Sequence, residues 1–226
     1  MLVVLSTLME NIKNYILLGP PGSGKSTQAD FFKERLELSH IDMGGELRSI
    51  ATEESPLGKE VYQTIYVKKE LASDEVVKQA LGRALAKADP KKGIVIDGAP
   101  RRESQIAEVI DILAEYGRDI DGVIFIDLPK EVSIDRISRR FNCEQCGEKF
   151  ISGMHPEDHA EPCFKCGGKL VQRKDDTPAG VENRWRIFHE DTEPVIRHFE
   201  KEGKLLRVDG KLPAGEIFQR IEERIV

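Results

Sequence analysis

Short runs of apolar, often β-branched residues alternate along this chain with longer stretches in which apolar residues recur at the spacing of a helix. This alternation is typical of an α/β fold, in which helices cover both faces of a parallel sheet and form three layers. The apolar runs predict five strands, at Tyr15–Leu18, Ser39–Ile41, Ile94–Asp97, Val123–Asp127 and Leu205–Val208.

Polar residues and prolines predict where several helices begin and end. Ser73 followed by Asp74 and Glu75 predicts a helix N-terminus, because acidic side chains favour the positive end of a helix. The last helix is expected to begin at Pro213 and to run to the C-terminus. Pro194 interrupts the stretch 178–201, and since proline cannot donate to the helical hydrogen-bond ladder, we expect two helices there.

Length and charge narrow the classes of protein. The chain of 226 residues suits one domain with an insertion or two. Its formal net charge is −6, with 34 basic and 40 acidic side chains interspersed, so we expect neither a nucleic-acid nor a membrane partner. Residues 1–10 lack a charged region and a cleavage-like site, so we interpret them as an N-terminal extension and not as a signal. The sequence predicts a cytoplasmic monomer.

The segment YILLGPPGSGKSTQA contains the spacing GxxxxGK[ST] directly after a predicted strand and before a predicted helix. In that context glycines let backbone N–H groups surround phosphates, the helix N-terminus adds partial positive charge, and a lysine reaches the terminal phosphates. A Gly/Pro turn that only caps a helix is the alternative, but motif and context agree on a nucleoside triphosphate site. The residues expected to contact ATP and its Mg²⁺ are Gly22, Ser23, Gly24, Lys25, Ser26 and Thr27.

All four cysteines form two CxxC pairs, and the segment that carries them, residues 142–169, breaks the alternation of strands and helices. Four thiolates at this spacing suit a closed, structural Zn²⁺ site, with His155 and His159 as weaker competing ligands. A redox pair and a nucleic-acid-binding zinc ribbon are the alternatives, although the many acidic residues of the segment disfavour the ribbon. The expected metal ligands are Cys143, Cys146, Cys163 and Cys166.

Arginines recur where a second phosphate group would need them, and no guanine-binding NKxD motif is present. Phosphoryl transfer between two polyanions needs several fixed cations, because negative charge spreads over the oxygens in flight. Any single one of these arginines could be an ordinary surface residue, but six of them at such positions are harder to explain in that way. They are Arg48, Arg101, Arg136, Arg140, Arg173 and Arg184.

Together these motifs resemble the adenylate kinases of the long, zinc-lid type, from about Tyr15 to the C-terminus. The matching segments are GPPGSGKSTQA, GGELR, LASDEVV, DGAPRRESQ, DRISRR, the two CxxC pairs and QRKDD. The resemblance implies a P-loop core with a five-stranded parallel sheet, a helical acceptor-binding insertion and a small zinc-bearing lid. The implied ranges are 1–42, 73–140 and 173–226 for the core, 43–72 for the insertion and 141–172 for the lid.

The resemblance also implies the reaction, ATP + AMP to two ADP, with Mg²⁺ on the nucleotides. Arg48 and Arg101 would hold the AMP phosphate, Gln105 would read its adenine, and Asp97 would orient Mg²⁺ through water. Gly98 and Met43 would complete the acceptor site. The remaining implied residues are Lys25, Arg136, Arg140, Arg173 and Arg184 around the transferring phosphoryl group, with Asp175 and Asp176 steadying the closed lid.

The chain departs from the family pattern at several positions, among them Lys69 in place of a glycine that closes a helix of the acceptor insertion, and three positions near the acceptor. Met43 stands in place of a threonine at the acceptor base, Gly45 in place of an aspartate, and Ala99 in place of an aromatic residue that would otherwise fill space beside the acceptor. A thioether still packs against a purine but loses a polar contact. Another nucleoside monophosphate is therefore an alternative acceptor. A nucleotide-binding regulatory protein without catalysis is the second alternative, which the lid arginines disfavour.

Overall fold

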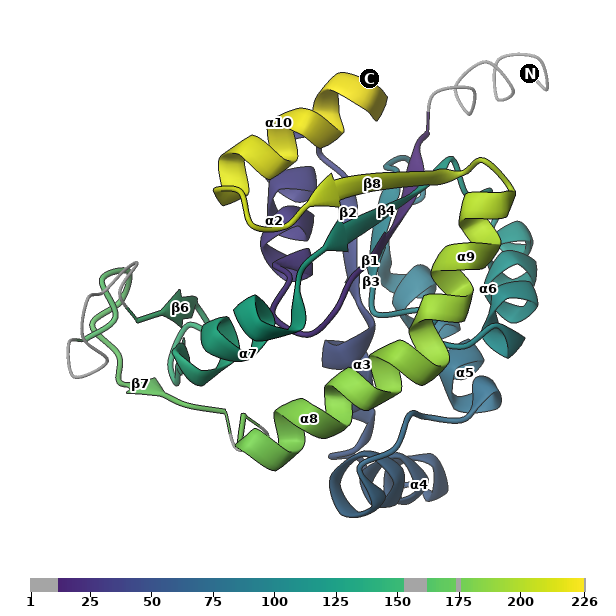
Figure 1. The fold of residues 1–226 in the computed structure, drawn as a ribbon. Coiled ribbons are helices and arrows are strands. Elements are labelled where there is room, and N and C mark those ends of the chain that lie inside the picture. The colour runs from purple at the N-terminus through teal and green to yellow at the C-terminus, as the bar shows by residue number, and fades with distance from the viewer. Residues whose placement is uncertain (1–11, 153–161, 174–175, 226) are drawn as a thin grey trace.

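The computed structural model describes residues 12–152, 162–173 and 176–225, and its centre is a five-stranded sheet (Figure 1). The predicted strands are confirmed, and no strand end differs by more than one residue from its predicted position. Adjacent strands are parallel and lie in the order β2-β3-β1-β4-β8. The strands are β1 (Asn14–Leu18), β2 (Ser39–Asp42), β3 (Ile94–Asp97), β4 (Gly122–Asp127) and β8 (Leu205–Asp209).

Helices cover both faces of this sheet, as the alternating pattern predicts (Figure 1). Because successive side chains of a strand point to opposite faces, Ile16 and Leu18 of β1 pack in one hydrophobic cluster and Tyr15 and Leu17 in another. The smaller cluster includes side chains of α2 (Lys25–Arg35) and α10 (Ala214–Ile225). The larger one includes side chains of α3 (Met43–Ile50), α5 (Asp74–Lys87), α6 (Ser104–Glu115) and α9 (Glu193–Lys201).

The predicted helix starts are confirmed at both places. The Ser73 hydroxyl accepts a hydrogen bond from the backbone N–H of Val76 at 3.4 Å, which caps α5. α10 begins one residue after Pro213, whose carbonyl accepts the N–H of Ile217 at 3.0 Å.

The stretch 178–201 contains two α-helices, as predicted, but no loop separates them. α8 (Pro178–Ile187) passes directly into a π-helical turn, η2 (Phe188–Thr192), and then into α9, so the chain coils without a loop (Figure 1). Pro194 lies in the first turn of α9, where a backbone N–H has no partner within the helix anyway. The wider π-helical turn before it supplies the irregularity that the proline requires.

Two smaller groups of elements extend from the core. α4 (Pro56–Tyr62) and the π-helical η1 (Gln63–Lys68) lie between α3 and α5 in the chain, at the lower edge of Figure 1. The other group is an antiparallel sheet in the order β6-β5-β7, built from β5 (Arg140–Cys143), β6 (Lys149–Ile151) and β7 (Leu170–Val171). None of the helices in the described ranges is both long and apolar enough to cross a membrane.

The small sheet follows α7 (Lys130–Ser138) and precedes α8. Its buried side chains form a cluster of their own, separate from the two clusters of the core. The members of this cluster are Cys143, Phe150, Cys163 and Leu170, with Phe141 packed against them. The small sheet therefore depends little on packing against the core.

Candidate active site

The loop between β1 and α2 has the geometry of a phosphate cradle. A Cβ atom at Gly19 would lie 2.6 Å from the Ser23 hydroxyl and 2.8 Å from the carbonyl of Ile126, so a larger residue does not fit. Gly24, at the N-cap of α2, has a φ of 94°, which favours glycine. Ser26 and Thr27 lie in the first turn of α2. The loop is thus shaped by close backbone approach on one side and by the helix N-terminus on the other.

The Lys25 side chain folds into this loop. Its ammonium group donates hydrogen bonds to the carbonyls of Gly19 at 2.8 Å and Pro20 at 3.0 Å. Burial lowers the pKa of Lys25 to about 8, although the nearby carboxylate of Asp97 opposes this shift. Further charges that lower the pKa of Lys25 are those of Arg101, Arg140 and Arg184. The site therefore gathers cations that repel one another, and a bound polyanion would relieve that repulsion.

Asp176 holds two of the predicted arginines together. Its carboxylate accepts two hydrogen bonds from Arg140, from Nε at 2.9 Å and from Nη2 at 2.7 Å. It accepts a third from Nη2 of Arg184 at 2.7 Å, and the Asp176 side chain is fully buried. Because Arg140 lies on β5 and Arg184 on α8, this carboxylate joins the small sheet to the core.

Two further arginines of the predicted group, Arg173 and Arg136, lie on either side of the small sheet in the chain. Arg173 follows β7, and its backbone carbonyl accepts the N–H of Asp176 at 3.0 Å. Arg136 lies on α7, and burial lowers its pKa. The carboxylates of Asp135 and Asp209 oppose this shift, whereas the charge of Arg139 adds to it. Three other residues that the sequence singled out, namely His155, His159 and Asp175, lie outside the described part of the chain.

A second group of predicted residues lies at the carboxyl end of β3. Asp97 ends this strand and is only 9% exposed. Arg101 Nε donates to the Gly98 carbonyl at 3.1 Å, and the Arg101 backbone N–H donates to Oε1 of Gln105 at 2.8 Å. Gln105 is 1% exposed, so its side-chain oxygen fixes the turn that carries Arg101.

Met43 and Ala99, two of the positions that depart from the family pattern, are packed in the core. Each is 1% exposed and belongs to the larger hydrophobic cluster. A Cβ atom at Gly98 would lie 3.5 Å from the Cβ of Met43, so the base of the methionine side chain borders the turn before Arg101. The side chains of Met43 and Ala99 are therefore part of the buried packing beside this turn and not of an exposed surface.

Arg48 has an acidic partner that the sequence analysis missed. Its Nη2 donates to Oδ2 of Asp42 at 3.3 Å, and both side chains are nearly half exposed. Exposed ion pairs contribute little free energy, so a phosphate can replace this carboxylate readily. The signal was an acidic residue directly after a predicted strand, since Asp42 ends β2 in register with Asp97 on β3.

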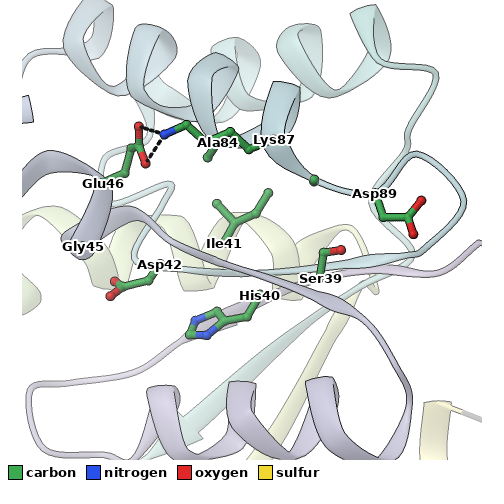
Figure 2. A pocket seen from close by; sticks show the side chains of 10 residues that line it. Ser39, His40, Ile41, Asp42, Gly45, Glu46, Ala84, Lys87 and Asp89 are labelled. Carbon is green, nitrogen blue, oxygen red and sulfur yellow. Dashed lines mark hydrogen bonds and ion pairs between the residues drawn. The ribbon is translucent and has the colours of Figure 1, made fainter. Parts of the chain in front are cut away.

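Figure 2 shows Asp42 at one end of a pocket that follows β2 between α3 and α5. The pocket has a volume of about 380 Å³, and Lys87 donates to both carboxylate oxygens of Glu46 along its side, at 2.9 and 3.1 Å. Its lining residues are Ser39, His40, Ile41, Asp42, Gly45, Glu46, Ala84, Lys87, Ala88 and Asp89. The carboxylates make this pocket unsuited to a phosphate, which separates it from the arginine-lined site.

The four cysteines converge as a possible metal site. Their sulfur atoms all lie within 4.8 Å of one another, with 3.4 Å between Cys143 and Cys166 and 3.7 Å between Cys146 and Cys163. Tetrahedral Zn–S bonds place sulfur atoms roughly 3.8 Å apart, so this donor set fits the ion. Gly147 has a φ of 70°, and its N–H donates to the Cys143 carbonyl at 3.0 Å. This hydrogen bond closes a tight turn that contains Cys143 and Cys146.

Known proteins align with nearly the whole chain. A family model described as adenylate kinase matches residues 17–204. Proteins named adenylate kinase from Syntrophobacter fumaroxidans and Archaeoglobus fulgidus are 40% and 37% identical over 210 residues each, covering 92% of this chain and 97% and 96% of the relatives. One from Syntrophomonas wolfei subsp. wolfei is 34% identical over 212 residues, covering 94% of this chain and 98% of the relative.

The lowered pKa of Lys25 predicts a pH dependence of triphosphate binding. Below pH 8 the ammonium is charged in the free protein, whereas above pH 8 it loses its proton and its attraction for phosphate. We expect the Kd for Mg-ATP to rise about tenfold between about pH 7 and about pH 9 at constant ionic strength, as measured by titration calorimetry. Lys25→Met should bind weakly at every pH, and Lys33→Met, on the exposed side of the same helix, should keep the wild-type profile. A flat wild-type profile would contradict the assignment.

Proposed function

This chain belongs to the adenylate kinase family, and we propose that the site described above transfers the terminal phosphoryl group of Mg-ATP reversibly to AMP, giving two ADP. The observation that carries this proposal is the convergence of Lys25, Arg140 and Arg184 beside a phosphate loop, at the same edge of the sheet as Arg101. Two nucleotides carry more negative charge than one ATP, and a site for both needs cations from several elements.

The proposed roles on the ATP side follow from this charge. Lys25 and the loop residues Gly22 to Thr27 bind the phosphates, and Lys25 gives up its carbonyl partners for phosphate oxygens. Arg136, Arg140, Arg173 and Arg184 stabilise the charge that spreads over the phosphoryl group in flight. Asp176 orients two of them, so that little reorganisation is needed during transfer.

Magnesium fits the oxygen donors near the loop, because it prefers hard ligands and retains several waters. The hydroxyls of Ser26 or Thr27 and, through water, the carboxylate of Asp97 would hold it, and the ion would neutralise phosphate charge during transfer. We propose no nucleophilic side chain. Catalysis comes from positioning, exclusion of water and stabilisation of charge.

On the acceptor side, we assign Arg48 and Arg101 to the AMP phosphate. Arg48 exchanges its exposed carboxylate partner for that phosphate. Gln105, Gly98 and Met43 would border the adenine, and the thioether of Met43 offers packing but no strong hydrogen bond to a base. This absence of a hydroxyl is the observation that favours the second candidate function, a kinase for another nucleoside monophosphate.

We propose that residues 1–42, 73–140 and 173–226 form the core, residues 43–72 the acceptor insertion and residues 141–172 a lid held together by Zn²⁺ on the four cysteines. The sulfur distances and the small separate cluster of apolar side chains support this role for the metal. Closure of the lid would bring Arg140 and Arg173 onto ATP and exclude water. Free cysteines favour a reducing compartment, and every assigned residue comes from one chain, so a cytoplasmic monomer suffices.

The test of the reaction is the initial rate with different acceptors at saturating Mg-ATP. A panel of AMP, CMP, UMP, GMP and their deoxy forms should show a strong preference for AMP, because the adenine is expected to contact Gln105. A preference for another monophosphate would support the second candidate. No transfer to any acceptor would leave a nucleotide-binding regulatory protein.

Arg140→Ala tests the phosphoryl clamp. We expect kcat to fall by about 100- to 1,000-fold, because a fixed cation at the transferring group is lost. Asp176 keeps its hydrogen bond to Arg184, so the buried carboxylate stays paired. Arg139→Ala is the matched control, since Arg139 is the adjacent arginine but pairs with Asp135 at the surface. Equal kcat values for both variants would exclude Arg140 from the clamp.

Removal of the metal tests the lid. We expect metal analysis to find a single zinc ion per chain, and a tight chelator to lower the melting temperature and the transfer rate, because the small sheet has few apolar side chains to hold it. Added Zn²⁺ should restore both. An unchanged melting curve in protein that contains no bound metal would refute the zinc site.

A further inference from the structure

A buried serine on α7 is hydrogen-bonded to the phosphate loop from outside. Ser133 is fully buried, and its hydroxyl donates a hydrogen bond to the backbone carbonyl of Pro21. The helix also packs closely here, because a Cβ atom at Gly22 would lie 3.0 Å from the Ile137 side chain and 3.2 Å from the Ser133 carbonyl. The outer side of the loop is therefore defined by α7.

This hydrogen bond fixes the direction of a peptide group in the cradle. The peptide bond is planar, with its C=O and N–H on opposite sides, so a Pro21 carbonyl directed at Ser133 turns the N–H of Gly22 away from α7. The carbonyls of Gly19 and Pro20 are already bonded to Lys25. A phosphate requires N–H groups facing it, and a carbonyl that turned inward would repel it.

The serine hydroxyl has a second partner, from a different helix. The indole Nε1 of Trp185 donates to Oγ of Ser133 at 2.7 Å, so the hydroxyl donates once and accepts once. Trp185 is the only tryptophan of the chain and packs edge-to-face on Phe188, with 5.5 Å between ring centres. It directly follows Arg184, so α8 contacts both the buried carboxylate of Asp176 and the serine that is hydrogen-bonded to the phosphate loop.

We propose that Ser133 and Trp185 form a two-step relay that positions the phosphate loop for ATP, with Ser133 as a positioning residue and Trp185 as the group that orients its hydroxyl. Both residues would act through the Pro21 carbonyl and not by contact with the nucleotide. The relay rests on the proposed function only in that the bound ligand is Mg-ATP. It ties the register of the loop to α8, the helix that carries Arg184.

The test compares Ser133→Ala, Trp185→Phe and the double variant. Each single change removes a buried hydrogen bond, and we expect each to raise the Kd and the KM for Mg-ATP by about fivefold to tenfold while the KM for AMP changes by less than about twofold. The double variant should be little worse than Ser133→Ala, because both changes break one chain of bonds. Ser138→Ala is the control, since this exposed serine lies on the same helix and its hydroxyl donates to the Asp135 carbonyl within α7.

Tryptophan fluorescence gives a second readout, because a single indole reports the relay. Mg-ATP should shift the emission of the wild type, and the shift should be much smaller in Ser133→Ala. Wild-type affinity in both single variants would overturn the relay, as would equal increases in the KM for ATP and AMP together with a lower melting temperature. If the wild type failed to phosphorylate AMP, the proposed function would fail, but the Mg-ATP affinities would still decide the relay.

Discussion

Repulsion among cations gathered at one edge of the sheet is the constraint that organises this molecule. Burial and neighbouring guanidinium groups make the charged form of Lys25 costly in the free protein, and the fold offsets this with carboxylates. Asp97 lies at the end of β3, and Asp176 is fully buried between Arg140 and Arg184. The strand order places β1, which leads into the phosphate loop, at the centre of the sheet between β3 and β4. A bound polyanionic ligand would therefore balance the charge of these cations.

Most of the architecture could be predicted from the sequence, because the decisive signals are local. Short β-branched runs such as Ile94–Asp97 favour a buried strand, and the structure agrees within one residue at every strand of the large sheet. Glycine spacing predicted the loop, since Gly19 has no room for a side chain. The spacing of the two CxxC pairs predicted that the four sulfur atoms lie close together, because four thiolates at this spacing suit a tetrahedral Zn²⁺ site.

What the sequence analysis missed are contacts that join distant segments. Ser133 lies 112 positions from Pro21 and 52 from Trp185, so no periodicity relates them. The partner of Arg48 was missed because Asp42 lies just after the predicted strand at 39–41, and no motif links it to an arginine six positions later. The two helices around Pro194 were predicted, but the π-helical turn that joins them was not. Proline is tolerated in the first turn of a helix, so it marks the start of α9 without requiring a loop before it.

The separate hydrophobic cluster of the small sheet has an evolutionary consequence. Its buried side chains are not shared with the clusters of the core, and it enters and leaves between α7 and α8. A change in its length or in its cysteines therefore requires no repacking of the large sheet. The two sheets can therefore diverge in sequence at different rates, because a substitution that weakens the small sheet leaves the packing of the large sheet intact.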